Sequence, residues 1–206
     1  MIKAIVTDFD GVLRHWQQGH LHALEQHCRL PADTLVTLCL ASDHRDLALR
    51  GHCTYDQWVD AIYQSVQEEY GRVIASQVIE TFQGPNYEID HDLIERYRKL
   101  FPGTLLILAT NATNRLPLEL QDAGLQHSFD HVFNSSAMGV AKPDPCFFHG
   151  LLISCGLRPH EVVFIDDTQA NVLAAQKIGM TAVQYQNRKQ LLQALGGLLE
   201  ASPMLA

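Results

Sequence analysis

The segment "VTDFDGV", residues 6–12, places two aspartates directly after a short apolar run. Residues 2–6 predict a strand, and in an extended chain successive side chains point to opposite faces, so Asp8 and Asp10 are expected to share a side and Phe9 to face away. The glycine that follows permits a sharp change of direction. Two carboxylates held close together repel unless a cation lies between them. The segment therefore predicts a site for a cation, for acid–base chemistry, or for both.

The composition fits a folded chain of ordinary size. It has 206 residues, of which 47% are hydrophobic and 18% are charged, enough for one domain or for a core with a modest insertion. The formal net charge of −8 argues against a general nucleic-acid binder, which normally carries a basic patch, but leaves small anionic substrates open.

The cysteines predict a reducing environment. Five cysteines are widely spaced without a CxxC pair, which disfavours structural disulfides and a cysteine zinc site. The sequence enters a strand without a signal peptide, and no apolar run approaches the ~20 residues that span a bilayer. We therefore expect a soluble, cytoplasmic protein, a monomer or homodimer, without a membrane or nucleic-acid partner.

Four further apolar runs resemble the first, at residues 105–109, 131–134, 162–165 and 181–184. Helical segments lie between them. Asp144 is expected to cap a helix that begins with Pro145, and Gly179 is expected to end the helix over residues 169–178. Strands that alternate with helices predict an α/β fold, a parallel sheet with helices on both faces.

Residues 19–83 offer helices and no convincing strand. Thr54 and Gln57 form a capping-box pattern, and apolar side chains then recur every fourth residue until Gly71. We interpret this block as an inserted helical module, which returns to the core through Gly84 and Pro85 and the helix that begins near Asp90. Extra helices packed rigidly on a single domain are the alternative.

Polar clusters follow the later strands. They are Thr110 to Thr113, Lys142 to Pro145, and Asp166 to Asn171. Each alone fits an ordinary helix cap. Ligands of parallel α/β sheets bind at the carboxyl ends of the strands, where all these clusters should meet Asp8 and Asp10. Together they predict carboxylates around a hard divalent cation, with a hydroxyl, an amide and an ammonium group that suit an adjacent anion.

The motifs "DFDGV", "TN", "KPDP" and "FIDD", with the helical insertion after the first, resemble the haloacid-dehalogenase-like hydrolase superfamily. The position of the insertion resembles the branch with a helical cap between the first and second motifs, and its phosphatase-type members. The resemblance covers about two thirds of the chain. It implies a Rossmann-like core over residues 1–16 and 86–206 and an all-α cap over residues 17–85.

By that resemblance, Asp8 is the nucleophile that forms an aspartyl-phosphate, and Asp10 is the general acid and then the base. Thr110 and Asn111 are expected to bind the phosphoryl oxygens, and Lys142 to balance the negative charge. Mg²⁺ is expected on the Asp8 carboxylate, the Asp10 carbonyl and an acid of the last motif. We assign Asp167 as its direct ligand and Asp166 as an outer one.

The resemblance implies a Mg²⁺-dependent phosphatase that acts on a small phosphorylated metabolite, such as a sugar phosphate. Relatives that cleave carbon–halogen bonds lack the second aspartate, so Asp10 favours phosphate ester hydrolysis over dehalogenation. A phosphomutase that uses the same aspartyl-phosphate is the main rival. It is weakened because Arg14 and His15 stand where some mutases carry an aspartate and a small hydroxyl residue. The alternative to an enzyme is a non-catalytic binding module with the same fold. The presence of a suitable residue at every catalytic position argues against it.

Overall fold

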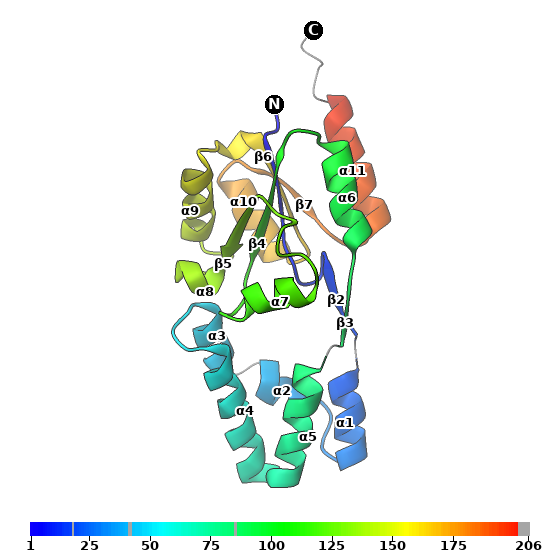
Figure 1. Cartoon of the computed structure of the whole chain (residues 1–206), viewed down its shortest axis with the longest axis vertical. Coiled ribbons are helices and arrows are strands. Elements are labelled where there is room, and N and C mark those ends of the chain that lie inside the picture. The colour runs from blue at the N-terminus through cyan, green and yellow to red at the C-terminus, as the bar shows by residue number, and fades with distance from the viewer. Residues whose placement is uncertain (18, 41–42, 85, 202–206) are drawn as a thin grey trace.

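The computed structural model describes residues 1–17, 19–40, 43–84 and 86–201. Its main sheet has five parallel strands in the order β5-β4-β1-β6-β7 (Figure 1). Their bounds are β1 Ala4–Thr7, β4 Leu105–Thr110, β5 His131–Asn134, β6 Val162–Asp166 and β7 Thr181–Gln184. All five predicted strands are thus confirmed, as is the α/β class. β1, β4 and β6 are almost wholly buried, which explains why they read as continuous apolar runs.

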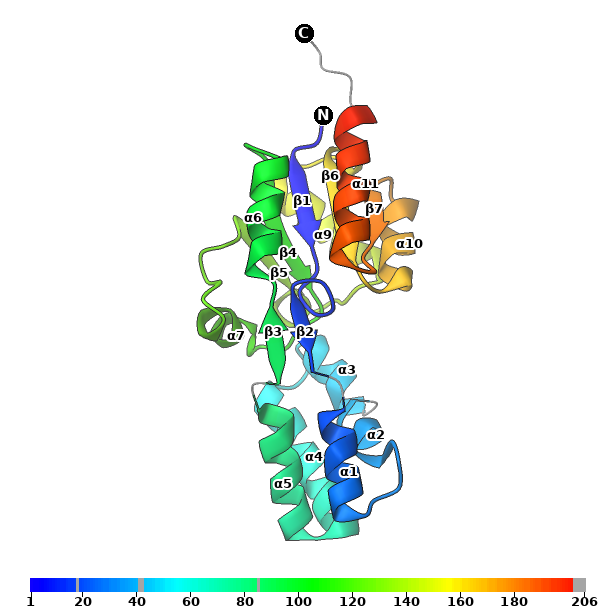
Figure 2. The ribbon, with the colours of Figure 1, turned by 90° about the vertical axis from the view of Figure 1, so that its right-hand side faces the viewer.

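Helices cover both faces of this sheet (Figure 2). On one face, α6 (His91–Leu100), α7 (Leu116–Asp122) and α11 (Arg188–Ala201) contribute to an apolar cluster with Ile5 and Leu106. On the other, α9 (Pro145–Cys155) and α10 (Gln169–Lys177) pack with Val6 and Ile107. The short α8 (Ser135–Met138) and the 3₁₀ turn η1 (Pro159–Glu161) complete the core connections. Consecutive β1 residues thus face opposite clusters, as the period of a strand requires.

The predicted helix caps are present. The Asp144 side chain accepts a hydrogen bond from the Cys146 backbone N–H at the start of α9, and Asp90 does the same for Leu93 in α6. Gly179 follows α10 with φ +92°, a left-handed conformation that glycine adopts without strain. The Asp90 and Asp144 caps begin helices at the carboxyl edge of the sheet, whereas Gly179 precedes β7 at the amino edge.

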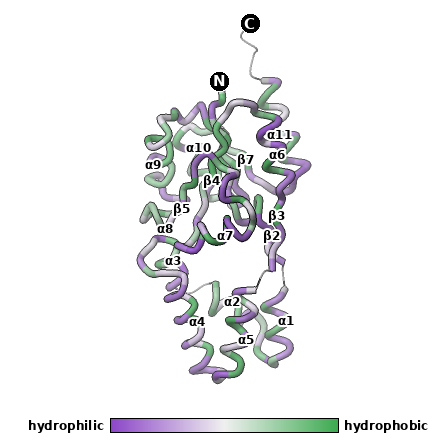
Figure 3. Tube along the Cα trace, in the orientation of Figure 1, coloured by the Kyte–Doolittle hydropathy of each residue, from purple (hydrophilic) through white to green (hydrophobic). Residues whose placement is uncertain are grey.

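The block over residues 19–83 is helical, as predicted. It contains α1 (His20–Cys28), α2 (Thr34–Leu40), α3 (Asp43–Leu49), α4 (Tyr55–Tyr70) and α5 (Arg72–Gln83). Thr54 and Gln57 exchange both bonds of the capping box. Hydrophobic and hydrophilic residues alternate along α4 and α5 (Figure 3), and the apolar ones join a separate cluster that includes Leu35, Trp58 and Val66.

A two-stranded antiparallel ribbon, absent from the sequence predictions, leads from the sheet to these helices. It pairs β2 (Arg14–Trp16) with β3 (Tyr87–Ile89) (Figures 1 and 2). Pro85, predicted as part of the return to the core, lies outside the described residues. The helical block also contacts the loop after β4: the Tyr55 backbone N–H donates a hydrogen bond to the Asn114 side-chain oxygen over 2.7 Å. In the described part of the chain, no helix is both long enough and apolar enough to cross a membrane.

Candidate active site

The sheet order brings the predicted clusters together. β1 lies between β4 and β6, so the chain segments that follow these strands emerge side by side at one edge. A cleft of about 1050 Å³ opens there. Six of the seven predicted site residues line it: Asp8, Asp10, Thr110, Asn111, Lys142 and Asp167. The seventh, Asp166, is fully buried beneath.

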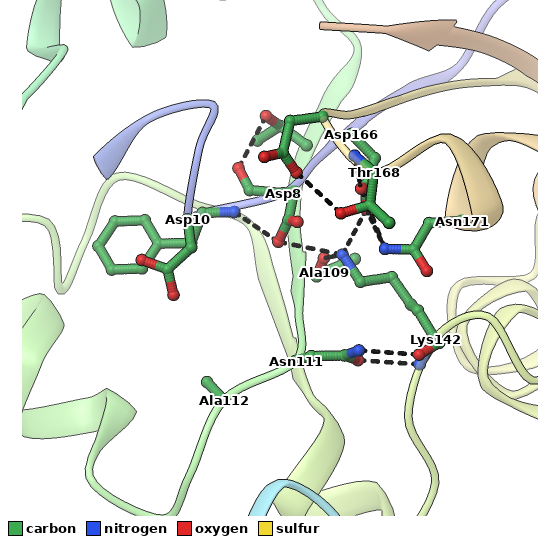
Figure 4. Close-up of polar contacts among 12 residues, drawn as sticks. Asp8, Asp10, Ala109, Asn111, Ala112, Lys142, Asp166, Thr168 and Asn171 are labelled. Carbon is green, nitrogen blue, oxygen red and sulfur yellow. Dashed lines mark hydrogen bonds and ion pairs between the residues drawn. The ribbon is translucent and has the colours of Figure 1, made fainter. Parts of the chain in front are cut away.

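Lys142 is the electrostatic centre of this cleft (Figure 4). Its Nζ atom lies 3.0 Å from Asp8 Oδ1 and 2.6 Å from Asp166 Oδ2, and it donates to the Ala109 carbonyl over 2.8 Å. Burial alone would lower the pKa of Lys142, but the charges of Asp8 and Asp166 raise it above its usual value. The ammonium group is therefore held in its charged form, 3% exposed, beside the proposed nucleophile.

Asn111 holds the backbone of Lys142. Its amide nitrogen donates to the Lys142 carbonyl and its Oδ1 accepts from the Lys142 N–H, both over 2.8 Å (Figure 4). The sequence resemblance implied that Asn111 binds phosphoryl oxygens. In this structure the Asn111 side chain is used to position Lys142. Thr110 is buried and supplies a hydroxyl to the lining of the cleft.

Asp8, Asp166 and Asp167 bring carboxylate oxygens within 4.8 Å of one another. Burial raises the pKa of Asp8 although Lys142 opposes the shift, and Asp166 adds to it. Burial and the charge of Asp166 also raise the pKa of Asp167. Such a group of crowded carboxylate oxygens is stabilised by an added cation, and Mg²⁺ prefers oxygen ligands of this kind.

The two acids of the last motif have different surroundings. Asp166 accepts from Lys142, from the Asn171 amide and from the Thr168 backbone N–H. Asp167 is exposed, lines the cleft and accepts from the Thr168 hydroxyl over 3.2 Å. Gly11 lies directly beside Asp167, and an added Cβ at Gly11 would lie 2.1 Å from Asp167 Oδ2. Only glycine leaves room for the carboxylate there.

The Asp10 carboxylate is held apart from the three acids. β1 ends at Thr7, and in the turn beyond it Asp10 accepts two hydrogen bonds from Arg14 and one from Trp16 Nε1. Alternation along β2 places Arg14 and Trp16 on one side of the ribbon. Sequence reasoning missed both partners. The arginine four residues after Asp10 was a visible signal, but an isolated one.

A model of the haloacid dehalogenase-like hydrolase family matches residues 2–179. Mouse bifunctional epoxide hydrolase 2 is 24% identical over 94% of this chain, which spans 38% of that protein. The chain thus spans little more than a third of that relative's length. Phosphoglycolate phosphatase of Yersinia pestis is 22% identical over 88% of this chain and 80% of its own.

A solved structure shares the fold over nearly the whole chain. It is a haloacid dehalogenase family enzyme of Bacteroides thetaiotaomicron in complex with magnesium and inorganic phosphate. It aligns with a TM-score of 0.72 over 93% of this chain and 99% of its own, at 18% identity.

Proposed function

Because the chain belongs to the haloacid dehalogenase-like hydrolase family and is a hydrolase enzyme, we propose that it is a Mg²⁺-dependent phosphatase of small phosphate monoesters. One observation carries the proposal. Asp8, with Lys142 Nζ 3.0 Å away, lines the same cleft as a second carboxylate, that of Asp10. This pairing supplies a nucleophile, a compensating cation and a proton donor around one space, as ester hydrolysis requires.

In the first proposed step, an oxygen of Asp8 attacks phosphorus. The Asp8–phosphorus bond forms, the bond from phosphorus to the ester oxygen breaks, and Asp10 gives its proton to the leaving alkoxide. In the second step, Asp10 accepts a proton from water as the water oxygen attacks phosphorus. Inorganic phosphate and free Asp8 are released, so atoms and charge balance over the cycle.

Lys142 stabilises the charge that moves from Asp8 onto the phosphoryl oxygens, and Asp166 and Asn111 hold it in position. This role needs no motion of Lys142, because its ammonium already lies between Asp8 and Asp166. Thr110 is the proposed side-chain donor to a phosphoryl oxygen. Asn111 acts through Lys142 in this proposal.

The donors fit a magnesium ion. Asp8 and Asp167 are the proposed direct carboxylate ligands, with the Asp10 backbone carbonyl, and Asp166 is the outer acid because Lys142 and Asn171 occupy its oxygens. A bound Mg²⁺ would supply positive charge to the substrate phosphate oxygens. The similar Bacteroides protein, in complex with magnesium and inorganic phosphate, supports a magnesium site by analogy.

We also propose that residues 17–85 form a cap over a core of residues 1–16 and 86–206. The separate apolar cluster of α1–α5 and the thin β2–β3 ribbon support this division. A cap above the cleft would exclude large substrates and admit small ones.

Phosphate release tests the proposal. Purified protein should hydrolyse an aryl phosphate such as p-nitrophenyl phosphate with Mg²⁺ and lose this activity with a chelator. Asp8→Asn should abolish turnover, while Asp60→Asn, on the exposed side of α4, is the matched control and should retain it. An Asp8→Asn variant with near-normal turnover would exclude Asp8 as the nucleophile.

A further inference from the structure

A second cavity, of about 500 Å³, adjoins the catalytic cleft. The two spaces share Asp10, Trp16, Arg45, Leu49 and Asn111 in their linings. The second cavity extends away from Asp8 and Lys142, which line only the cleft, toward α4, α5 and the β2–β3 ribbon. Its volume is within the range of small-molecule sites, roughly 300–1,000 Å³.

Aromatic rings form much of the wall of this cavity. They come from the ribbon and from two helices: Trp16, Tyr55, Trp58, Phe82 and Tyr87. The rings contact one another edge to face, with centroids 5.3 Å apart for Trp58 and Phe82 and for Trp16 and Tyr87. Such a wall is prearranged, because each ring is fixed by its neighbour.

Leucines complete the apolar lining. Leu21, Leu40 and Leu49 come from three different helices, α1, α2 and α3. Of these, Leu40 is 43% exposed, so a large apolar side chain faces open space beside the catalytic cleft. Burial of such surface by a ligand is favourable.

Three charged groups of the lining bind one another, whereas Arg45 and Asp122, which also line the cavity, have no side-chain hydrogen bond or ion pair among the described residues. Arg14 binds Asp10 and Glu119, and the Arg115 guanidinium lies 4.7 Å from the centre of the Tyr55 ring. The His20 ring also lines the cavity, and its Nδ1 lies 2.7 Å from the Gln17 carbonyl oxygen. A sugar carries a hydroxyl on almost every carbon and needs a partner for each when it is desolvated. This lining suits an apolar group better.

The geometry points to a substrate whose leaving group is a bulky apolar alcohol, either aromatic or long-chain aliphatic, that occupies this cavity. The inference rests on the proposed phosphatase function and deepens it. Asp10 lies at the border of the two spaces and gives its proton to the ester oxygen. The phosphoryl group therefore lies on the Lys142 side of Asp10 and the alcohol on the aromatic side. Sugar phosphates, the example that the sequence suggested, are then poor substrates.

A series of phosphate esters with alcohols of increasing length tests the preference for an apolar leaving group directly. The esters are ethyl, butyl and octyl phosphate, 2-naphthylmethyl phosphate and glucose 6-phosphate, all with primary alkoxide leaving groups. Full burial of a methylene corresponds to about a fourfold gain in affinity, so we expect kcat/KM to rise roughly ten- to a hundredfold from butyl to octyl phosphate. The octyl and naphthylmethyl arms distinguish an aliphatic from an aromatic preference. A flat series, or glucose 6-phosphate as the best ester, would overturn the inference.

A matched pair of variants tests the position of the alcohol. Leu40→Glu places a carboxylate in the cavity, whereas Leu47→Glu places one on α3 at a leucine that lines neither space. The two leucines are 43% and 40% exposed, so neither substitution disturbs a buried core. We expect Leu40→Glu to lower the octyl-to-ethyl ratio of kcat/KM at least tenfold and Leu47→Glu to preserve it. An equal effect of both variants would contradict the proposed position.

A binding experiment separates the inference from the proposed function. Octylphosphonate and ethylphosphonate are not hydrolysed, and calorimetry with Mg²⁺ present should show tighter binding of the octyl compound to the wild type. If no ester is hydrolysed but octylphosphonate still binds more tightly, the apolar site stands and the phosphatase function fails. If esters are hydrolysed and the two phosphonates bind equally, the phosphatase stands and the apolar site fails.

Discussion

Arg14 binds both carboxylate oxygens of Asp10, with Nε 2.6 Å from Oδ1 and Nη2 2.9 Å from Oδ2. The third nitrogen, Nη1, donates to Glu119 on α7 over 2.6 Å, and the guanidinium carbon lies 4.5 Å from the centre of the Phe9 ring. Although burial would lower the pKa of Arg14, its bonds to Asp10 and Glu119 raise it. The planar group therefore links the proposed acid–base residue to the core as a fixed, charged fork.

Arg14→Lys should keep the positive charge but lose the two parallel hydrogen bonds to the Asp10 carboxylate. A lysine ammonium bonds as a point and cannot fix both oxygens of Asp10. We expect kcat to fall by up to about 10²-fold through misplacement of Asp10, with a smaller change in KM. Steady-state kinetics on an alkyl phosphate, whose alkoxide needs a proton, measures the loss.

An aryl phosphate is the internal control for this variant, because its phenolate leaves without full protonation. The Arg14→Lys defect in a single-turnover phosphorylation step should be smaller with that ester. Equal losses with both esters would show that Arg14 supports the fold of the site rather than the placement of Asp10.

Lys142 and Asp166 should be strongly coupled in stability. Both side chains are fully buried, and Lys142→Met leaves Asp8 and Asp166 facing each other without compensation. Removal of one partner of a buried ion pair typically costs about 3–5 kcal/mol. Urea unfolding of the chelator-treated protein should show a loss of that order.

The double variant Lys142→Met/Asp166→Asn removes one of the two opposed carboxylates. We expect it to recover part of the stability that Lys142→Met loses but none of the phosphatase activity. Together with the single Asp166→Asn variant, these proteins form a double-mutant cycle. If the two single changes in unfolding free energy add up to that of the double variant, Lys142 and Asp166 are not coupled.

Gly11 and Gly103 offer a matched test of the acidic group. Both have a positive φ, +80° and +78°, so alanine at either position should cost a similar 1–2 kcal/mol of unfolding free energy. Only at Gly11 would the new Cβ meet a side chain, 2.1 Å from Asp167 Oδ2, whereas nothing lies within 4 Å at Gly103. Of the two variants, only Gly11→Ala should raise the Mg²⁺ concentration needed for half-maximal activity, by at least tenfold.

The thermal shift induced by Mg²⁺ gives an independent readout of Gly11→Ala. An ion at 100 times its dissociation constant stabilises a protein by about 2.7 kcal/mol, and this gain should shrink for Gly11→Ala but persist for Gly103→Ala. A full shift in both variants would remove Asp167 from the proposed ligands.

The sequence predicted the main sheet because strands buried on both faces are continuous apolar runs, as β4 and β6 are. It did not predict β2 and β3. Each has only three residues, and paired residues such as His15 and Glu88 are distant in sequence. A ribbon of three-residue strands is too short for a period that distinguishes it from a loop.

The grouping of the candidate residues was predictable because most lie at or just after the end of a strand, although α8 separates Lys142 from β5; their contacts were not predictable. Arg14 and Glu119 are 105 positions apart, and the Asn111–Lys142 pair joins two loops that only the sheet order makes neighbours. Spacing along the chain has no information on such pairs. The cavity beside Asp10 was equally hidden, because its wall draws on α1–α5, α7 and the β2–β3 ribbon.

The last prediction separates a phosphatase from a phosphomutase, and it rests on Asp10. Asp10→Asn keeps the backbone carbonyl proposed as a magnesium ligand and one side-chain oxygen that can accept from Arg14, but it removes the base. Discharge of phosphorylated Asp8 should then slow by roughly 10²–10⁴-fold, as is typical of lost acid–base catalysis. With an aryl phosphate the first step still proceeds, so the variant should accumulate a phosphoenzyme, visible as a mass increase of ~80 Da.

The Asp8→Asn/Asp10→Asn double variant is the control for that mass increase and should not show it. In the wild type, water alone should discharge the phosphoenzyme rapidly, because a phosphatase needs no other acceptor. A mutase would retain its phosphoenzyme in water and discharge it faster when a second phosphorylated alcohol is added. Acceptor-dependent discharge in rapid-quench experiments would therefore replace the proposed hydrolysis with phosphoryl transfer, even if Asp8, Asp10 and Lys142 all keep the roles assigned to them.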